Sequence, residues 1–153
     1  MCLKRLVFIA LLALQSSAGE GAGSGTIAIG AAATPAPALT VQYLANPDHA
    51  YHFTTHYNPE GARLSGDYQR LLVPAFGYGR GWRLAFYTGF GLAGESQRQD
   101  ELSEIYQLRL PLGGQCEFTD LHLNTFAEVA AALGPLPETR IALGMAAGLR
   151  ATF

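Results

Sequence analysis

The chain has 153 residues, of which 49% are hydrophobic and 14% are charged, and its formal net charge at pH 7 is −2. This length fits one domain behind a short leader. The slightly acidic balance excludes the basic surface that nucleic-acid-binding proteins use.

Residues 1–18 predict a secretory signal peptide. Lys4 and Arg5 give a charged start, residues 6–14 are an apolar run, and residues 15–18 end in the small residues of a cleavage site. The alternative, a membrane anchor, would need roughly 20 apolar residues. Removing this leader leaves eight Arg and no Lys against twelve acidic residues, a formal charge of −4. It also leaves Cys116 as the only cysteine, which excludes an internal disulfide and a cysteine-based zinc site.

Residues 19–25 are rich in Gly, Ser and Ala and predict a flexible lead-in. Eight stretches with alternating apolar and small or polar residues follow, and turn-forming residues separate them. The expected strands are residues 26–33, 39–43, 51–57, 63–69, 83–92, 106–118, 123–133 and 139–153. The connections are mostly too short for parallel crossovers, so antiparallel hairpins are expected. Residues 127–133 could be helical by propensity, but they lack caps and are taken as strand.

The last stretch, residues 139–153, shows the alternation most clearly. One face carries large or medium apolar residues and ends on Phe153, whereas the other carries Gly, Ala, Thr and Arg. The second face is too poor in charge for a wetted surface and too small to fill a sandwich core. Small inward side chains suit the narrow interior of an eight-stranded barrel. An apolar exterior around a polar interior is typical of membrane barrels. The expected fold is therefore a closed eight-stranded antiparallel up-and-down transmembrane β-barrel over residues 26–153.

These features resemble the small eight-stranded outer-membrane β-barrel proteins of Gram-negative bacteria, over residues 25–153. The matching pieces are residues 39–43, 66–68, 86–91, 108–113, 126–129 and 148–153. The aromatic C-terminus, Phe153, resembles the family's insertion signal, although Ala151 stands where an aromatic is common. The resemblance implies outer-membrane localisation and assembly by the barrel assembly machinery, after export through the Sec translocon. It implies no established activity.

Four polar residues are expected on the inward face near mid-membrane if both termini are periplasmic: Gln42, Asp67, Arg109 and Glu128. A charge in a narrow interior must be paired and hydrogen-bonded. Arg109 and Glu128 lie on consecutive strands, and Arg can bind a carboxylate with two parallel hydrogen bonds. The main interpretation is a structural ion-pair plug, and the alternative is a gate or selectivity ring.

A hydrolase reading rests on Ser65, Asp67, His52 and His56, which share the inward face of one hairpin. It is weak, because an enzyme acting on outer-membrane lipid needs a nucleophile that lipid can reach. His52 and His56 are about 13 Å apart on an extended strand, too far to hold one metal ion. The sequence therefore predicts no catalytic, cofactor-binding or metal-binding residue.

Aromatic residues near the expected strand ends predict interfacial girdles, with ordinary β-propensity as the alternative. They are Tyr57, Tyr78, Trp82, Tyr106 and Phe118, together with Phe153. Cys116 falls among the lipid-facing positions.

The predicted function is a monomeric outer-membrane barrel with a structural or envelope-stabilising role, in contact with outer-membrane lipid and lipopolysaccharide and with no nucleic acid. The alternatives are a narrow pore for small solutes and a lipid-modifying acyl hydrolase. The expected extracellular loops, residues 34–37, 58–61, 95–101 and 135–138, are short, which argues against an adhesin.

Overall fold

The computed structural model describes residues 25–58, 61–72, 78–79, 81–97, 105–134 and 141–153. The predicted signal peptide and nearly all of the lead-in lie outside these residues. The strands are β1 (Thr26–Ala33), β2 (Pro37–Asn46), β3 (His49–Asn58), β4 (Gly61–Leu72), β5 (Tyr78–Gly79), β6 (Trp82–Gln97), β7 (Ile105–Phe118), β8 (Leu123–Leu133) and β9 (Ile141–Thr152), with one 3₁₀ turn, η2 (Thr119–Leu121). No helix among the described residues is long and apolar enough to cross a bilayer.

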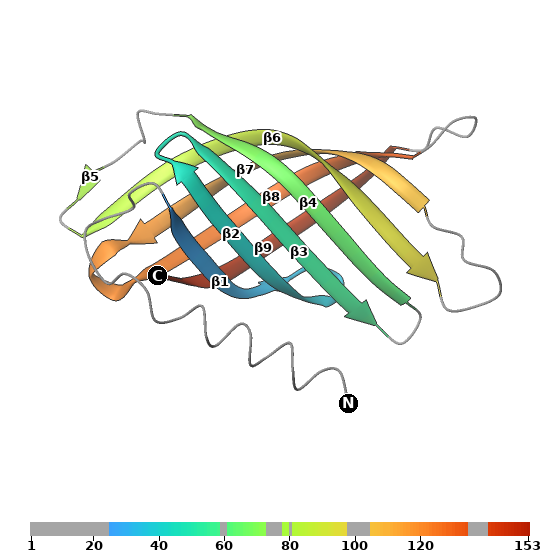
Figure 1. Cartoon of the computed structure of the whole chain (residues 1–153), viewed down its shortest axis with the longest axis horizontal. Coiled ribbons are helices and arrows are strands. Elements are labelled where there is room, and N and C mark those ends of the chain that lie inside the picture. Colours follow the sequence, from blue (N-terminus) through green and yellow to red (C-terminus); the bar gives the residue numbers. More distant parts are fainter. Residues whose placement is uncertain (1–24, 59–60, 73–77, 80, 98–104, 135–140) are drawn as a thin grey trace.

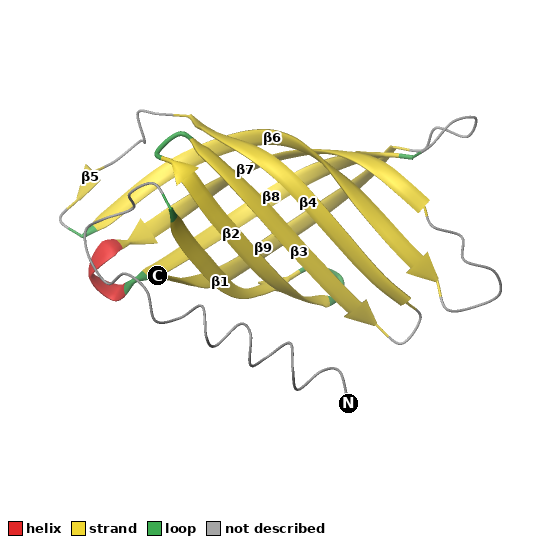
Figure 2. Ribbon diagram, viewed as in Figure 1, coloured by secondary structure: helices red, strands yellow, loops and turns green. Residues whose placement is uncertain are grey.

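Eight of these strands form a closed antiparallel barrel, as Figure 1 shows. Strands β1 to β4 and β6 to β9 pair in chain order, β4 pairs with β6, and β1 pairs with β9 to close the seam. The two-residue β5 pairs only with the first two residues of β6, Trp82 and Arg83. The predicted eight-stranded up-and-down barrel is confirmed, and Figure 2 shows that nearly all of the described chain is strand.

The strands begin and end beyond some of the predicted limits. The loop expected from Glu95 is wrong for residues 95–97, because β6 continues to Gln97 and pairs there with Gly61–Arg63 on β4. Ladder hydrogen bonds keep this polar segment extended. Pro37 begins β2 rather than ending a loop, and the first residue of a strand is a position that proline tolerates. Residues 98–104 and 135–140 lie outside the described part.

The alternation of side chains fixes an inside and an outside. Nine formally charged residues lie on the described strands, and eight of them take inward positions: Arg63, Asp67, Arg83, Glu95, Arg109, Glu117, Glu128 and Arg150. Large apolar side chains point outward and are exposed, for example Leu143 at 77%, Met145 at 73% and Leu64 at 61%. The barrel therefore has a polar interior and an apolar exterior.

The start of β1 and the end of β9 lie at the same end of the barrel, which we call the termini end (Figure 1). Phe153 and Ile27 exchange backbone hydrogen bonds there, at 2.8 and 3.2 Å. The turn after β2, the end of β4, the start of β6 and η2 lie at the same end, as antiparallel order requires.

Aromatic rings lie on glycines of the neighbouring strand at four directly paired positions. The pairs are Phe53 with Gly66, Phe86 with Gly114, Tyr87 with Gly113, and Phe126 with Gly148. A Cβ on Gly113 would lie 2.5 Å from Cζ of Tyr87, and one on Gly148 would lie 2.6 Å from the Phe126 ring. Each ring thus occupies volume that a side chain on the opposite strand would otherwise need.

Candidate functional site: a polar network inside the barrel

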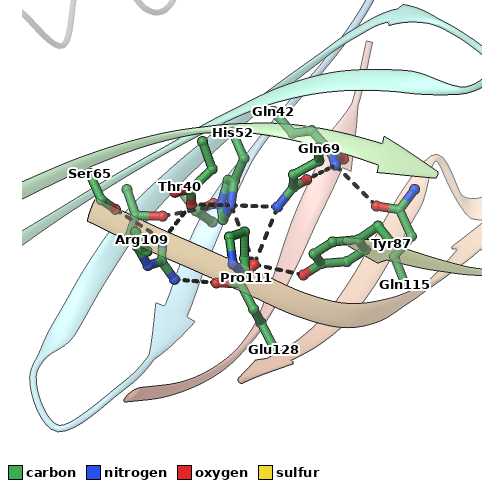
Figure 3. A network of polar contacts seen from close by, with 12 residues as sticks. Thr40, Gln42, His52, Ser65, Gln69, Tyr87, Arg109, Pro111, Gln115 and Glu128 are labelled. Atoms are coloured by element: carbon green, nitrogen blue, oxygen red, sulfur yellow. Dashed lines mark hydrogen bonds and ion pairs between the residues drawn. The ribbon is translucent and has the colours of Figure 1, made fainter. Parts of the chain in front are cut away.

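Arg109 joins two carboxylates near the middle of the barrel, as Figure 3 shows for the Glu128 side. Its Nη1 donates to Asp67 Oδ2 and, at 3.3 Å, to Ser65 Oγ, and its Nη2 donates to Glu128 Oε1. Strands β4, β7 and β8 bring these residues together. The Asp67 and Glu128 side chains are almost fully buried, whereas the Arg109 side chain retains 12% exposure.

Glu128 is the better satisfied of the two carboxylates. Its Oε2 accepts from the Tyr87 hydroxyl at 2.9 Å and from Gln69 Nε2 at 3.2 Å. Asp67 Oδ1 has no hydrogen-bond partner among the described residues and faces Gly91 on β6. An unmet buried carboxylate oxygen costs stability, so Asp67 depends more than Glu128 on its single ion pair.

Gln42, the fourth residue predicted on the inward face, is connected to Arg109, Asp67 and Glu128 through one intermediate side chain. Its Nε2 donates to Gln69 and to Gln115, both at 3.1 Å, and its Oε1 accepts from Arg150 Nη1 at 3.0 Å. Gln69 then connects Gln42 to Glu128 (Figure 3). The four predicted residues therefore belong to one continuous network of hydrogen bonds.

Arg150 on β9 is the network's second cation, and it is only 1% exposed. It donates to Thr40 at 3.2 Å, Asn124 at 3.5 Å and His52 Nε2 at 2.9 Å, besides Gln42, and its guanidinium lies 3.7 Å from the centre of the Phe126 ring. The sequence places Arg150 on the inward face but does not show that its side chain contacts residues of other strands. The available signal was its position as a charge among inward Gly and Ala residues of the last strand.

Arg150 reaches β2 and β3 by passing over β1. The inward positions of β1 nearest to Arg150 are Ala28, Gly30 and Ala32, and Gly30 pairs directly with Arg150. A Cβ on Gly30 would lie 1.8 Å from the Leu149 carbonyl oxygen and 2.6 Å from Arg150 Cα. The small residues of β1 therefore leave the space through which Arg150 spans the β1–β9 seam.

His52 lies between the Arg150 guanidinium on one side and the carboxylates of Asp67 and Glu128 on the other. Its Nε2 is 2.9 Å from Arg150 Nη2 and 2.6 Å from Thr40 Oγ1, and its Nδ1 is 3.2 Å from Gln69 Nε2. A charged donor at the shorter distance outweighs a neutral donor at the longer one, so Nε2 is the acceptor. The proton then sits on Nδ1, which faces Glu128 and Asp67 at 3.8 and 3.9 Å.

The same residues have the composition of a metal site. Ligand atoms of His52, Asp67 and Glu128 all lie within 4.8 Å of one another. Arg109 already binds both carboxylates, and Arg150 donates to the imidazole. Two guanidiniums therefore supply the positive charge that a metal ion would bring, and the cluster fits an ion-pair network better than a metal centre.

The residues considered for a hydrolase do not form a catalytic unit. Ser65 Oγ accepts from Arg109, and His56 Nδ1 contacts Thr34 Oγ1 at 3.0 Å. Within the described part of the chain, neither His52 nor His56 is hydrogen-bonded to Ser65, so the base that a serine nucleophile needs is absent from its side.

Near the termini end the interior narrows to a cavity of about 10 Å³, lined in part by Gln115, Glu117 and Asn124. That is at the lower limit for one water molecule. The ion pair between Arg83 and Glu117, at 3.0 Å, lies toward the same end.

The predicted girdle residues lie on the exterior as far as they are described. Tyr57 and Tyr106 are more than 60% exposed, Trp82 and Phe153 about 40%, and Phe118 is half-buried. Tyr78 lies in β5, and its side chain is outside the described part. The exterior also carries Tyr43, Tyr51 and Phe86, which the sequence prediction did not include.

No family model matches the chain, and no curated protein matches it significantly. Among solved structures it is similar to the N-terminal β-barrel domain of Pseudomonas aeruginosa OprF. The alignment covers 86% of this chain and 99% of that domain, with a TM-score of 0.58 and 15% identity. The likeness establishes the barrel fold.

Proposed function

We propose that this protein is an outer-membrane β-barrel with a structural, envelope-stabilising role and a lumen closed by its polar network. The observation that carries the proposal is the placement of charge. Of the charged residues on the described strands, Arg70 alone takes an outward position. Exposed apolar patches on soluble monomers rarely exceed a few hundred Å², and a barrel wall with one charge fits lipid rather than water.

The filled interior supports a structural role over a pore. Arg150, Tyr87, His52 and Gln69 are each less than 2% exposed, and together with Arg109 and Glu128 they span the lumen. Eight strands enclose a space that side chains can just fill. A steady conducting path would require several of these hydrogen bonds to break together.

The same contacts support a non-enzymatic role. The inward Ser, His and Asp side chains are bound to arginine or threonine partners and do not face lipid. As partners we propose outer-membrane phospholipid and lipopolysaccharide, with export by the Sec translocon, assembly by the barrel assembly machinery, and a monomeric final state.

Fractionation and gel mobility test this proposal. We expect the protein in the outer-membrane fraction, folded in SDS without heating, and shifted in mobility after boiling. Recovery as a soluble periplasmic protein would contradict it. Planar-bilayer recordings should show no steady conductance, and lipid A should keep its acyl chains when incubated with the folded barrel. Stable channels would favour the pore, and released fatty acid would favour the hydrolase.

A further inference from the structure

Arg70 is an exposed arginine on the outward face of a wall that otherwise carries no formal charge among the described strands. It pairs directly with His49 on β3 and with Thr88 on β6, so these three polar side chains form one row across the exterior. Within the part of the chain that the structure describes, the Arg70 guanidinium has no hydrogen bond or ion pair. A cation at a lipid-facing position is costly unless an anion or water meets it.

Aromatic and apolar residues border this row. Toward mid-barrel, Tyr51, Tyr68 and Phe90 are paired across the same three strands, with ring centres 5.8 and 5.4 Å apart. Toward the termini end, Leu72 pairs with Phe86. The row therefore lies where an aromatic band marks the interface of a membrane barrel.

His49 is oriented to serve as a second donor. Its ring stacks on Tyr68 at 5.6 Å, and its Nδ1 contacts the Tyr68 hydroxyl. When that hydroxyl donates to Nδ1, the imidazole proton sits on Nε2, which has no hydrogen-bond partner in the described part of the barrel. The Thr88 hydroxyl makes only a long contact, 3.4 Å to the Pro111 carbonyl.

We propose that Arg70, His49 and Thr88 bind the phosphate of a phospholipid headgroup in the leaflet at the termini end. The guanidinium offers two parallel donors that match phosphate oxygens, and its aliphatic stem can lie along the wall while its head reaches the headgroup layer. The neighbouring apolar wall accommodates the acyl chains, which is why a phospholipid fits better than free phosphate. This inference rests on the proposed membrane location.

Lipid retention by the folded full-length chain tests the site. The barrel is held in dodecyl maltoside, a detergent without phosphate, and native mass spectrometry counts bound phosphatidylglycerol against diacylglycerol, which lacks the phosphate. We expect one phosphatidylglycerol per barrel and little diacylglycerol. Arg70→Gln should weaken retention about tenfold or more, and Arg70→Lys should give an intermediate loss because it keeps the charge without the paired donors. His49→Phe, which keeps a ring against Tyr68, should weaken it several-fold.

Arg63→Gln is the matched control, because it makes the same change at an inward arginine that contacts Gln107, and it should leave retention unchanged. Equal retention by the wild type and Arg70→Gln would overturn the inference, as would equal binding of the two lipids. Full competition by millimolar inorganic phosphate would assign the site to the free ion instead. Insertion of the same preparation into vesicles separates the two proposals: a barrel that inserts without Arg70-dependent retention refutes only the phosphate site.

Discussion

Arg109 pairs with two carboxylates at once, and this arrangement determines how much each single substitution destabilises the barrel. Asp67 and Glu128 both bind it, so removing Arg109 leaves two buried carboxylates, whereas removing Glu128 leaves the Arg109–Asp67 pair intact. Asp67 has an unmet oxygen and few other partners, whereas Glu128 keeps Tyr87 and Gln69. Removing Arg109 should therefore destabilise the buried carboxylate of Asp67 more than that of Glu128.

Glu128→Ala is expected to lower the free energy of unfolding by about 3 kcal/mol, the lower end of the range for breaking a buried ion pair, because Arg109 keeps Asp67 while Tyr87 and Gln69 lose their acceptor. Adding Arg109→Ala should cost less than the sum of the two single losses, since the pair is direct. Leu110→Ala is the control, and it should cost less because Leu110 faces outward at 44% exposure and lipid can refill the space. Denaturant unfolding in vesicles is measured for the wild type, the two single variants, the double variant and Leu110→Ala. Strictly additive losses would remove the energetic coupling of the pair.

Two substitutions of Tyr87 distinguish the stability contribution of its hydrogen bond from that of its packing. Tyr87→Phe removes the donor to Glu128 Oε2 but keeps the ring on Gly113, and a hydrogen bond to a charged group contributes about 1.5–3 kcal/mol. Tyr87→Ala should cost more, because it also empties the space beside Gly113. Equal losses in unfolding measurements would show that the hydroxyl carries the whole effect.

At the scale of elements, the weakest closure expected is the β1–β9 seam. It has six registered pairs, from Ala28 with Thr152 to Ala33 with Ala147, against twelve between β4 and β6. Arg150 adds contacts from β9 to β2, β3 and β8, so it holds the seam from inside.

Arg150→Met should therefore loosen the seam selectively. Methionine keeps much of the length of the side chain but loses every donor. We expect backbone hydrogen exchange to accelerate at least tenfold in β1 and β9, with little change in β6 and β7. Gln115→Met is the control, since it removes a buried lumen hydrogen bond to Gln42 away from the seam. Faster exchange spread evenly over all strands would refute a seam-specific role for Arg150.

The alternation of residues allowed the barrel and its inward positions to be predicted from sequence, because a strand's side-chain period is two and each turn resets it. Arg109 and Glu128 could be paired because β7 and β8 are consecutive. The contacts of Glu128 with Tyr87 and Gln69 could not, because they cross the lumen and depend on the stagger of distant strands. The reach of Arg150 depends on how closely Gly30 lets β9 approach, which alternation does not encode. Residues 95–97 of β6 were predicted to be a loop because their side chains are polar. Side-chain polarity does not indicate whether the backbone pairs with a neighbouring strand.

At the scale of the whole molecule, substitution can separate the observed backbone contact of Phe153 from its predicted role in membrane insertion. Its backbone pairs with Ile27, and its aromatic side chain resembles the insertion signal of outer-membrane barrels. Phe153→Ala keeps the backbone pairing and removes the ring, whereas deletion removes both. We expect both changes to leave protein in the periplasm, measured by fractionation, with the deletion at least as severe. Normal assembly of both proteins would show that Phe153 is not an insertion signal.

The aromatic–glycine pairs bear on how such a barrel drifts over evolutionary time. At Phe53 with Gly66 and at Phe86 with Gly114, an added Cβ on the glycine would come closer to the partner's ring than to any backbone atom, so the wall constrains the summed volume of two facing positions rather than the identity of either. A ring can therefore move to the partner strand if the glycine moves the other way, and the fold persists while both positions change. In lineages that make such exchanges, sequence identity is lost at both facing positions together. A barrel of this kind is then better traced through compensating substitutions at registered positions than through residue-by-residue similarity.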